Sequence, residues 1–138
     1  MPVIRRGEAH DLAQVAAIQD ASPEAPHWRA EDYSEYDLLV AVCENRVAGF
    51  LASRTLAGEE HEILNLAVDP EFRRRGIGRR LCQTFLGGLR GSVFLEVRES
   101  NQAARNLYLS LGFQELGRRS GYYDGPPETA IVMKFHSC

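Results

Sequence analysis

The segment between residues 62 and 97 constrains the fold of this chain more than any other part of the sequence. Glu62–Val68 has the composition of a β-strand, and Pro70 ends it because proline cannot donate to a strand ladder. Gly76–Leu89 then carries an apolar residue at every fourth position, which predicts a helix with one buried face. A compact apolar strand, Val93–Val97, follows. The order strand, helix, strand predicts a β-α-β unit with a right-handed parallel crossover.

The remaining sequence predicts an antiparallel sheet around this unit. Upstream, the expected elements are an edge strand at Val3-Ile4, a helix at 11–20, a loop at 22–28, an unassigned or weakly helical stretch at 30–36, and strands at 37–43 and 47–56. Turns are expected at 44–46 and 57–60. Downstream, the expected elements are a helix at 101–111, capped by Ser100 and Gly112, and strands at 114–122 and 129–135 joined by a turn at 124–127. The fold class is therefore mixed α/β, with a largely antiparallel sheet.

Size and charge exclude several classes of protein. A chain of 138 residues with 44% apolar and 25% charged residues is expected to form one globular domain, residues 1–138. A net charge of −3 gives no general attraction to nucleic acid. The first eleven residues resemble no signal peptide, and no apolar run is long enough for a membrane helix. We expect a cytoplasmic protein that binds neither membranes nor nucleic acid directly.

The cysteines and histidines do not predict a metal site. The three cysteines lie far apart and lack zinc-ligand spacing, so we expect reduced thiols. The four histidines are scattered along the chain and are expected at the surface or in loops. These residues are Cys43, Cys82, Cys138, His10, His27, His61 and His136.

Five arginines gather where the predicted helix begins. Arg73, Arg74 and Arg75 precede Gly76-Ile77-Gly78, and two more follow in the first turn. A helix N-terminus exposes unpaired N–H groups and binds anions, while cations placed there oppose the helix dipole. This arrangement predicts a small anionic ligand; the alternative is a solvated basic face with a glycine turn. Position 81 is Leu81, so the G-x-G-x-x-G dinucleotide motif is absent, and no P-loop motif is present.

Residues 65–78 resemble the coenzyme A signature of the GNAT N-acetyltransferases, in which Q/R-x-x-G-x-G/A cradles a pyrophosphate. Arg73, Gly76 and Gly78 occupy the signature positions. The resemblance extends over nearly the whole chain, through the opening Ile4-Arg5-Arg6 and the segment 101–113. Within the family, the motifs Leu95-Glu96-Val97-Arg98, Ser100-Asn101 and Tyr122-Tyr123 most resemble ribosomal-protein-alanine acetyltransferases. The short exit of the glycine-opened helix at 89–92 and the segment 25–28 depart from that subfamily.

The resemblance implies the GNAT fold, a mostly antiparallel sheet with flanking helices and a β-α-β unit that binds acetyl-CoA. It implies that the strand ending at Val68 bulges and diverges from Val93–Val97, so that the pantetheine enters between them. No metal is implied. The residues expected to bind acetyl-CoA are Leu66, Ala67 and Val68 through their backbones, together with Arg73, Arg74, Arg75, Gly76, Ile77, Gly78 and Asn101. Without the resemblance, Asn101 reads as a helix-end residue.

Acetyl transfer to an amine needs a base and benefits from an acid. An amine attacks only as the free base, and at pH 7 about a tenth of α-amines are neutral, against less than about a thousandth of lysine side chains. Glu96 is a candidate base because it interrupts an apolar strand; the alternative is a glutamate held by Arg98 or another arginine. The resemblance makes Tyr108 the acid that protonates the leaving thiol. By its pattern alone, Tyr108 is a core residue on a helix stripe.

Three functions follow from these residues. The first is transfer of acetyl from acetyl-CoA to a primary amine, the N-terminal α-amine of a protein such as a ribosomal protein. The second is a GNAT enzyme for a small amine, either an amino acid or an antibiotic. The third is an acetyl-CoA-binding sensor without catalysis. A monomer and a homodimer are both compatible with the sequence.

Overall fold

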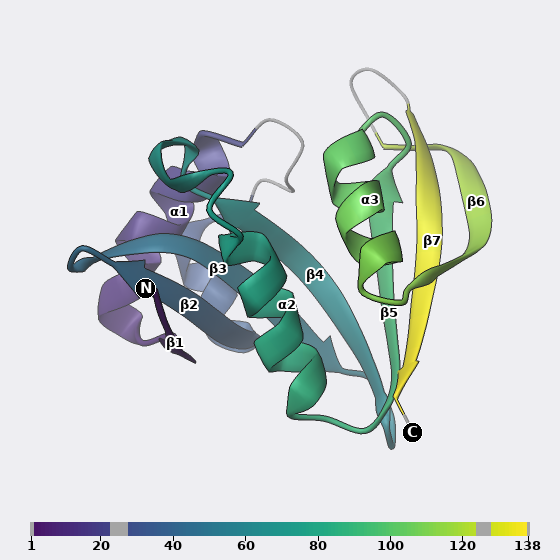
Figure 1. Ribbon diagram of the computed structural model, residues 1–138, viewed down its shortest axis with the longest axis horizontal. Helices are drawn as coiled ribbons and strands as arrows, with labels where there is room; N and C mark the ends of the chain where they lie inside the picture. The colour runs from purple at the N-terminus through teal and green to yellow at the C-terminus, as the bar shows by residue number, and fades with distance from the viewer. Residues whose placement is uncertain (1, 23–27, 124–127, 138) are drawn as a thin grey trace. The chain divides into compact units, whose positions relative to one another are not determined.

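The computed structural model describes residues 2–22, 28–123 and 128–137, and the side chains of 2–22, 28–120 and 128–136. The described residues form seven strands, hydrogen-bonded in the order β1-β2-β3-β4-β5-β7-β6 (Figure 1). Contacts divide the chain into two compact units. Unit 1 contains residues 1–54 and 63–89, and unit 2 contains residues 55–62 and 90–138.

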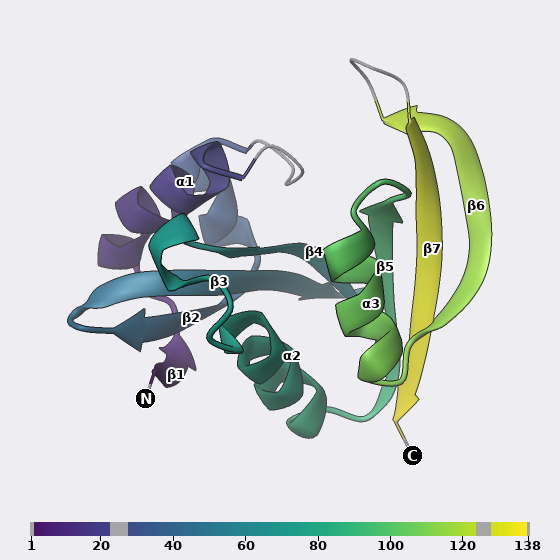
Figure 2. The ribbon, with the colours of Figure 1, turned by 45° about the horizontal axis from the view of Figure 1, so that its top comes forward.

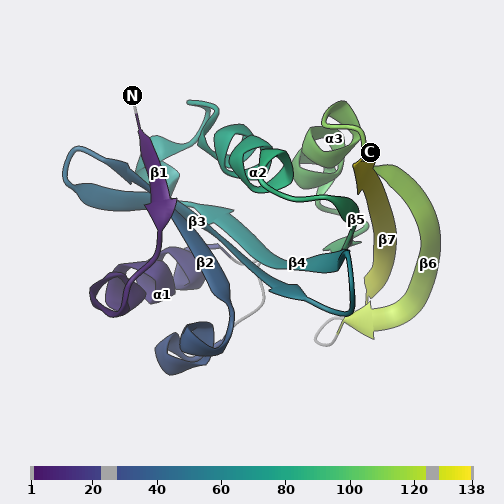
Figure 3. The same cartoon turned by 90° about the horizontal axis from the view of Figure 1, so that it is seen from below.

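Unit 1 is a sheet with helices on both faces. Its elements are β1 (Val3–Arg6), a 3₁₀ turn η1 (Ala9–Asp11), α1 (Leu12–Asp20), a 3₁₀ stretch η2 (Ala30–Glu35), β2 (Asp37–Cys43), most of β3 (Arg46–Thr55) and of β4 (Glu60–Val68), η3 (Pro70–Phe72) and α2 (Ile77–Gly87). In Figure 3, α1 and η2 cover one face of the sheet and α2 covers the other. The hydrophobic core cluster to which α1 contributes consists of Val15, Ile18, Tyr33, Leu38, Val40, Val47, Phe50, Ala52 and Ala67.

Gly49 lets α2 pack closely against the sheet of unit 1. A Cβ atom at this position would lie 3.1 Å from the Ala67 carbonyl oxygen, 3.1 Å from Ile77 Cγ2 and 3.4 Å from Leu81 Cδ1. A larger residue would therefore push away the start of the helix, because packed interiors leave no room for an added methyl group. Gly49 thus sets the position of the helix that opens at Gly76.

Unit 2 is a sheet with one closely packed face. Its elements are the start of β4, β5 (Gly91–Arg98), α3 (Gln102–Ser110), β6 (Gln114–Tyr123) and β7 (Glu128–Ser137). β4 pairs in parallel with β5 through Glu60–Glu62 and Ser92–Phe94, while β5–β7 and β6–β7 are antiparallel. The helix α3 lies along β5 and β7 (Figure 2). Parallel pairing of β4 with β5 confirms the predicted β-α-β unit.

Side chains along β5 alternate between the two faces of this sheet. Val93, Leu95 and Val97 are buried, and their direct partners on β7 are Phe135, Met133 and Ile131. Direct cross-strand partners point to the same face. Phe135 packs on Phe113, whose ring packs on Tyr108 of α3, with both pairs of ring centroids 5.4 Å apart. The buried face of the sheet is therefore the α3 face.

The structure confirms the predicted order of elements and the mixed α/β class. Residues 30–36, which the sequence left unassigned or weakly helical, form a 3₁₀ stretch over Ala30–Glu35. The N-cap prediction was wrong: Asn101, not Ser100, caps α3, because its side chain accepts the Ala104 N–H at 3.2 Å. The turn predicted at 124–127 and residues 23–27 of the predicted loop lie outside the described residues. The single-domain expectation stays a prediction.

Neither described cysteine is disulfide-bonded. Cys43 is half-buried and Cys82 is buried, and burial raises the pKa of Cys82 to about 12. A thiol that stays protonated at neutral pH is a poor nucleophile. Within the described ranges, no helix has both the length and the apolar character needed to cross a membrane.

A buried carboxylate fastens the start of α1 to β1. Asp11 is almost fully buried and accepts two hydrogen bonds from the Arg5 guanidinium, at 2.8 and 2.9 Å. It also accepts the Glu8 N–H at 2.8 Å. The hydrogen bonds from Arg5 hold the pKa of Asp11 below its ordinary value, although burial opposes this shift.

Asp11→Asn is expected to lower the free energy of unfolding by about 2–3 kcal/mol near pH 7, since it leaves Arg5 without its charged partner. The pKa of Asp11 is lower in the folded protein than in the unfolded one. Its stabilisation is therefore complete above about pH 4 and is lost as the pH falls through the folded value. Urea unfolding at several pH values should show the difference between wild type and variant shrinking below pH 4. Asp37→Asn, at an exposed carboxylate, is the control, and a difference as large at pH 3 as at pH 7 would contradict the account.

Candidate active site

Residues 69–76 of unit 1, which we call the arginine–glycine loop, lead into α2 through a left-handed residue. Gly76 is the N-cap of α2, with φ +74° and ψ 16°. The first helical hydrogen bond joins the Arg80 N–H to the Gly76 carbonyl at 3.0 Å, so the N–H groups of residues 77–79 precede the helical ladder. A Cβ atom at Gly76 would meet no atom of the described chain within 4 Å. Open space beside exposed N–H groups suits a phosphate group.

Two of the loop arginines, Arg73 and Arg75, contact other residues of unit 1. The Nε atom of Arg73 donates to the Val68 carbonyl at 3.2 Å, and its Nη2 donates to the Ser22 hydroxyl at 3.3 Å. Arg75 forms an ion pair with Glu44 at 3.5 Å. Arg73 therefore fastens the loop to the end of β4, and the backbone N–H groups, rather than its side chain, are the anion donors that the geometry favours.

Phe72 anchors the arginine–glycine loop to the β2–β3 hairpin. Its ring is buried, and the guanidinium groups of Arg46 and Arg75 lie 4.7 and 5.0 Å from its centroid. Arg46 also pairs with Glu71 of the same loop. Arg74 has φ +66°, a left-handed conformation that is costly for a residue with a side chain. Such strain is typical of ligand-binding loops, where the surroundings hold the backbone in place.

A buried polar network supports the end of β4. The Tyr33 hydroxyl donates to Gln19 and accepts from Asn65 Nδ2 at 2.9 Å. Gln19 in turn binds the backbone of Trp28 through both ends of its amide, at 2.6 and 2.9 Å. Burial raises the pKa of Tyr33, so its hydroxyl stays protonated and acts as a donor. The network holds Asn65 directly before Leu66–Val68, the strand end whose backbone was predicted to bind the coenzyme.

Tyr108 lies in unit 2, within the C-terminal cap of α3. Gly112 has φ +104°, as predicted, and the N–H groups of Gly112 and Phe113 donate to the carbonyls of Leu109 and Tyr108 at 3.1 and 3.0 Å. This is a Schellman motif, and the Tyr108–Phe113 ring contact is its usual hydrophobic partner. The tyrosine ring is buried and packs on Phe113, while the Tyr108 carbonyl is bound within the cap. The core role and the predicted acid role are compatible, because a fixed ring positions its hydroxyl.

Glu96 occupies the opposite face of the same sheet. It alternates with Leu95 and Val97 along β5, and its side chain is about one-fifth exposed. Its carboxylate pairs with Arg119 of β6, with Oε1 3.2 Å from Nη1. An arginine partner for Glu96 was an alternative reading of the sequence, with Arg98 as the nearest choice; the partner that the structure provides is Arg119. The predicted base and the predicted acid therefore stand on different faces of the unit 2 sheet.

Asn101 follows β5 and opens α3 in a loop that is tied to β7. The Ser100 N–H donates to the Glu128 carboxylate at 2.6 Å, and the Arg98 guanidinium lies 3.4 Å from it. The Ser100 hydroxyl, the Ser100 N–H and Arg98 together hold the pKa of Glu128 below its ordinary value. The helix-end role of Asn101 is thus observed, while its contact with the coenzyme stays a prediction.

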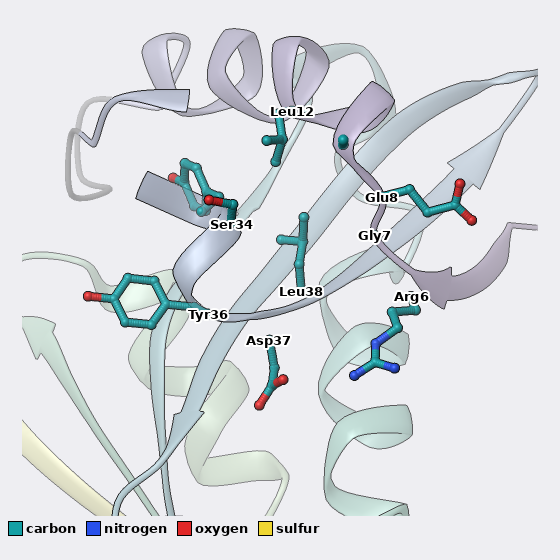
Figure 4. A pocket seen from close by; sticks show the side chains of 10 residues that line it. Arg6, Gly7, Glu8, Leu12, Ser34, Tyr36, Asp37 and Leu38 are labelled. Carbon is teal, nitrogen blue, oxygen red and sulfur yellow. The ribbon is translucent and has the colours of Figure 1, made fainter. Parts of the chain in front are cut away.

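A separate pocket in unit 1 contains none of the predicted site residues. It has a volume of about 240 Å³ and lies between β1, η2 and the start of β2 (Figure 4). Arg6, Glu8, Tyr36 and Asp37 are among the side chains that line it. Among the residues the structure describes, no group of three histidine, cysteine, aspartate or glutamate side chains could hold a metal ion.

Unit 1 thus presents a glycine-opened helix start, and unit 2 presents a carboxylate and a phenol on opposite faces of its sheet. Comparison with known proteins defines this arrangement further. The model of the acetyltransferase (GNAT) family matches residues 8–113. The chain belongs to this family, whose members use acetyl-CoA as the acetyl donor.

Several relatives are similar over nearly their whole length. The ribosomal protein bS18-alanine N-acetyltransferase of Escherichia coli K12 is 42% identical over 143 aligned residues, which cover 96% of each chain. The crystal structure of the ribosomal-protein-S18-alanine N-acetyltransferase from Escherichia coli superposes with a TM-score of 0.87 and 31% identity, covering 100% of this chain and 96% of that one. Ard1 from Thermoplasma volcanium has a TM-score of 0.89 and 27% identity, with 99% and 98% covered.

Sequence reasoning missed two residues that shape these sites. Gly49 could have been found, because an isolated glycine inside a strand signals a close backbone approach. Arg119 was harder to find: a β-bulge decides which face of β6 it occupies, and Gly117 signals a bulge there but does not specify the resulting register with β7. Leu66–Val68 and Arg73–Gly78 lie together in unit 1, whereas Glu96, Asn101 and Tyr108 lie in unit 2.

Gly76→Ala is expected to weaken coenzyme A binding at least about tenfold, because the added carbon enters the open space beside Gly76, where the phosphate is expected. The left-handed backbone also costs the variant about 1–2 kcal/mol of stability. Calorimetry with coenzyme A should show binding by the wild type that weakens with added salt. Gly87→Ala, at the other end of α2, is the matched control and should bind normally. Wild-type affinity in Gly76→Ala, measured at a temperature where the variant is folded, would exclude the start of α2 as the phosphate site.

Proposed function

We propose that this protein transfers the acetyl group of acetyl-CoA to the N-terminal α-amine of a protein, with a ribosomal protein as the first acceptor to test. The observation that carries the proposal is the 42% identity over 96% of both chains to a relative named for acetylating the alanine of ribosomal protein bS18. Membership of an acetyltransferase family supplies the reaction type. We place the reaction in the cytoplasm, where ribosomal proteins are made.

In this proposal, unit 1 binds the coenzyme. The N–H groups that follow Gly76 receive the pyrophosphate, and the glycine keeps the approach open. Leu66, Ala67 and Val68 offer backbone groups to the pantetheine at the end of β4. Arg73 acts mainly as a positioning residue, because it holds the Val68 carbonyl through its Nε atom. Arg74 and Arg75 add positive charge around the site, which favours an anionic ligand.

Unit 2 supplies the proton transfers. Glu96 takes a proton from the acceptor amine, directly or through a water molecule, and Tyr108 gives a proton to the departing thiolate. The first transfer makes the amine nucleophilic, and the second makes the thiolate a better leaving group. Their placement on opposite faces of the β5–β7 sheet suits these roles. The amine and the thiolate act at different sides of the carbonyl carbon, so each meets its own proton-transfer group.

Glu96→Gln tests the base and the acceptor together. The variant keeps the shape of the side chain but removes the base, so its rate deficit should be large near pH 7 and shrink above about pH 8, where α-amines are already neutral. The measurement is a pH–rate profile of wild type and variant on two peptides, one with a free N-terminus and one with a blocked N-terminus and an internal lysine. Glu99→Gln, which disrupts a different arginine pair in unit 2, is the control.

The outcomes separate the candidate functions. A deficit equal at every pH would assign Glu96 a positioning role rather than proton transfer. Equal activity on the blocked peptide would overturn the α-amine assignment and leave the acetyltransferase reading intact. If small amines are acetylated and neither peptide is, the small-molecule acetyltransferase is favoured. If acetyl-CoA binds but no amine is acetylated, the sensor is favoured.

Tyr108→Phe is expected to lower kcat by about 10²–10⁴, the usual contribution of a general acid. The ring keeps its packing on Phe113, so the melting temperature and the affinity for coenzyme A should change little. Steady-state kinetics at saturating acetyl-CoA, with calorimetry on the same samples, provide the measurement. An unaltered kcat would return Tyr108 to a purely structural role in the α3 cap.

A further inference from the structure

Arg119 reaches Glu96 across an intervening strand. β6 pairs only with β7 among the described strands, and β7 separates it from β5. Arg119 lies opposite Ala130 of β7, and Glu96 lies opposite Val132 of the same strand. Ala130 and Val132 are two residues apart and point to the same face. Both charged side chains therefore stand on one face, where their atoms Nη1 and Oε1 approach to 3.2 Å.

A β-bulge in β6 places Arg119 on this face. Glu115 pairs with Met133 and Gly117 pairs with Val132, so Leu116 is an extra residue in the ladder. If Leu116 instead paired with Val132, as in an unbulged ladder, Arg118 would lie opposite Ala130 and Arg119 would turn to the α3 face. Leu116 is well exposed, so packing of its own side chain does not explain the bulge. Bulges re-aim side chains beside active sites, and here the re-aimed side chain meets the proposed base.

The pair presents two opposite charges side by side to solvent. The Arg119 side chain is 58% exposed and the Glu96 side chain 21% exposed. An exposed ion pair contributes little to stability, so stability alone does not account for the arrangement. A guanidinium group has several N–H donors in a planar fork, and can therefore hold a carboxylate and still donate to a second oxygen.

We propose that Glu96 and Arg119 together recognise the α-aminoacyl group of the acceptor, an inference that rests on the proposed function and specifies its substrate class. Glu96 accepts an N–H of the α-amine, and Arg119 donates to the carbonyl oxygen of the same first residue. Standard bond lengths place that nitrogen and that oxygen about 3 Å apart, close to the 3.2 Å between the two protein atoms. The four atoms form a ring in which the charges alternate.

This recognition distinguishes an N-terminus from a lysine side chain. In an N-terminal residue the carbonyl carbon is two bonds from the amine nitrogen, whereas the lysine amine ends a chain of methylene groups. A lysine amine could reach Glu96 but would offer Arg119 no oxygen. The substrate class is therefore peptides and amides of α-amino acids with a free amine, and the first carbonyl contributes to affinity.

The test is a cycle that changes the protein and the acceptor separately. The acceptors are a peptide with alanine at its first position and the same peptide with that first carbonyl replaced by thiocarbonyl, whose sulfur is a weaker hydrogen-bond acceptor. Both are assayed with wild type, Arg119→Gln and Arg118→Gln. Arg118 is the matched control because it pairs with Glu99 and Glu115 and not with Glu96.

We expect Arg119→Gln to raise KM for the normal peptide about 10- to 100-fold, the loss of one charged hydrogen bond, with a smaller change in kcat. Wild type and Arg118→Gln should bind the thiocarbonyl peptide more weakly than the normal one, and Arg119→Gln should not distinguish them. A thiocarbonyl penalty that persists in Arg119→Gln would overturn the inference while leaving the proposed function standing. Wild-type protein that acetylates neither peptide would overturn the proposed function, and this inference with it.

Discussion

The two-residue period of β5 is the constraint on which the chemistry proposed for unit 2 depends. Val93, Leu95 and Val97 must point to the buried face, because the aromatic stack from Phe135 to α3 packs there. The same period sends Glu96 to the other face, where a carboxylate keeps access to water and to an arginine. One strand thus separates a buried phenol from a partly exposed carboxylate without any special backbone conformation.

Turns and loops, rather than long helices or strands, hold the predicted site residues in place. A left-handed glycine precedes α2, whose first N–H groups have no partner in the helix, and another follows α3, where the cap satisfies carbonyl groups at the helix end. Arg73 and Phe72 hold the loop before α2, and the Glu128 carboxylate holds the loop before α3. Because side-chain contacts fix these loops, the backbone groups at the two helix starts are in place before any ligand arrives.

Local patterns in the sequence were sufficient to predict most of the fold. The strands over residues 37–43 and 47–56, the helix opening at Gly76 and the cap at Gly112 follow from alternation, four-residue spacing and glycine positions. The predicted N-cap of α3 was wrong because a serine and an asparagine stand next to each other before the helix, and both residue types are good N-caps. The Glu96–Arg119 pair was not predicted, since it depends on a bulge beside Gly117 whose register shift the local sequence pattern does not specify. The roles of Glu96, Tyr108 and Asn101 stay predictions.

The central claim is that acetyl is transferred to an N-terminal α-amine. The most direct measurement is fragmentation mass spectrometry of a peptide that carries both a free N-terminal alanine and an internal lysine, after incubation with the wild-type protein and acetyl-CoA near pH 7. The account predicts one acetyl group, located on the first residue, with the lysine unmodified. Acetyl located on the lysine, or no acetylated peptide at any enzyme concentration, would contradict it.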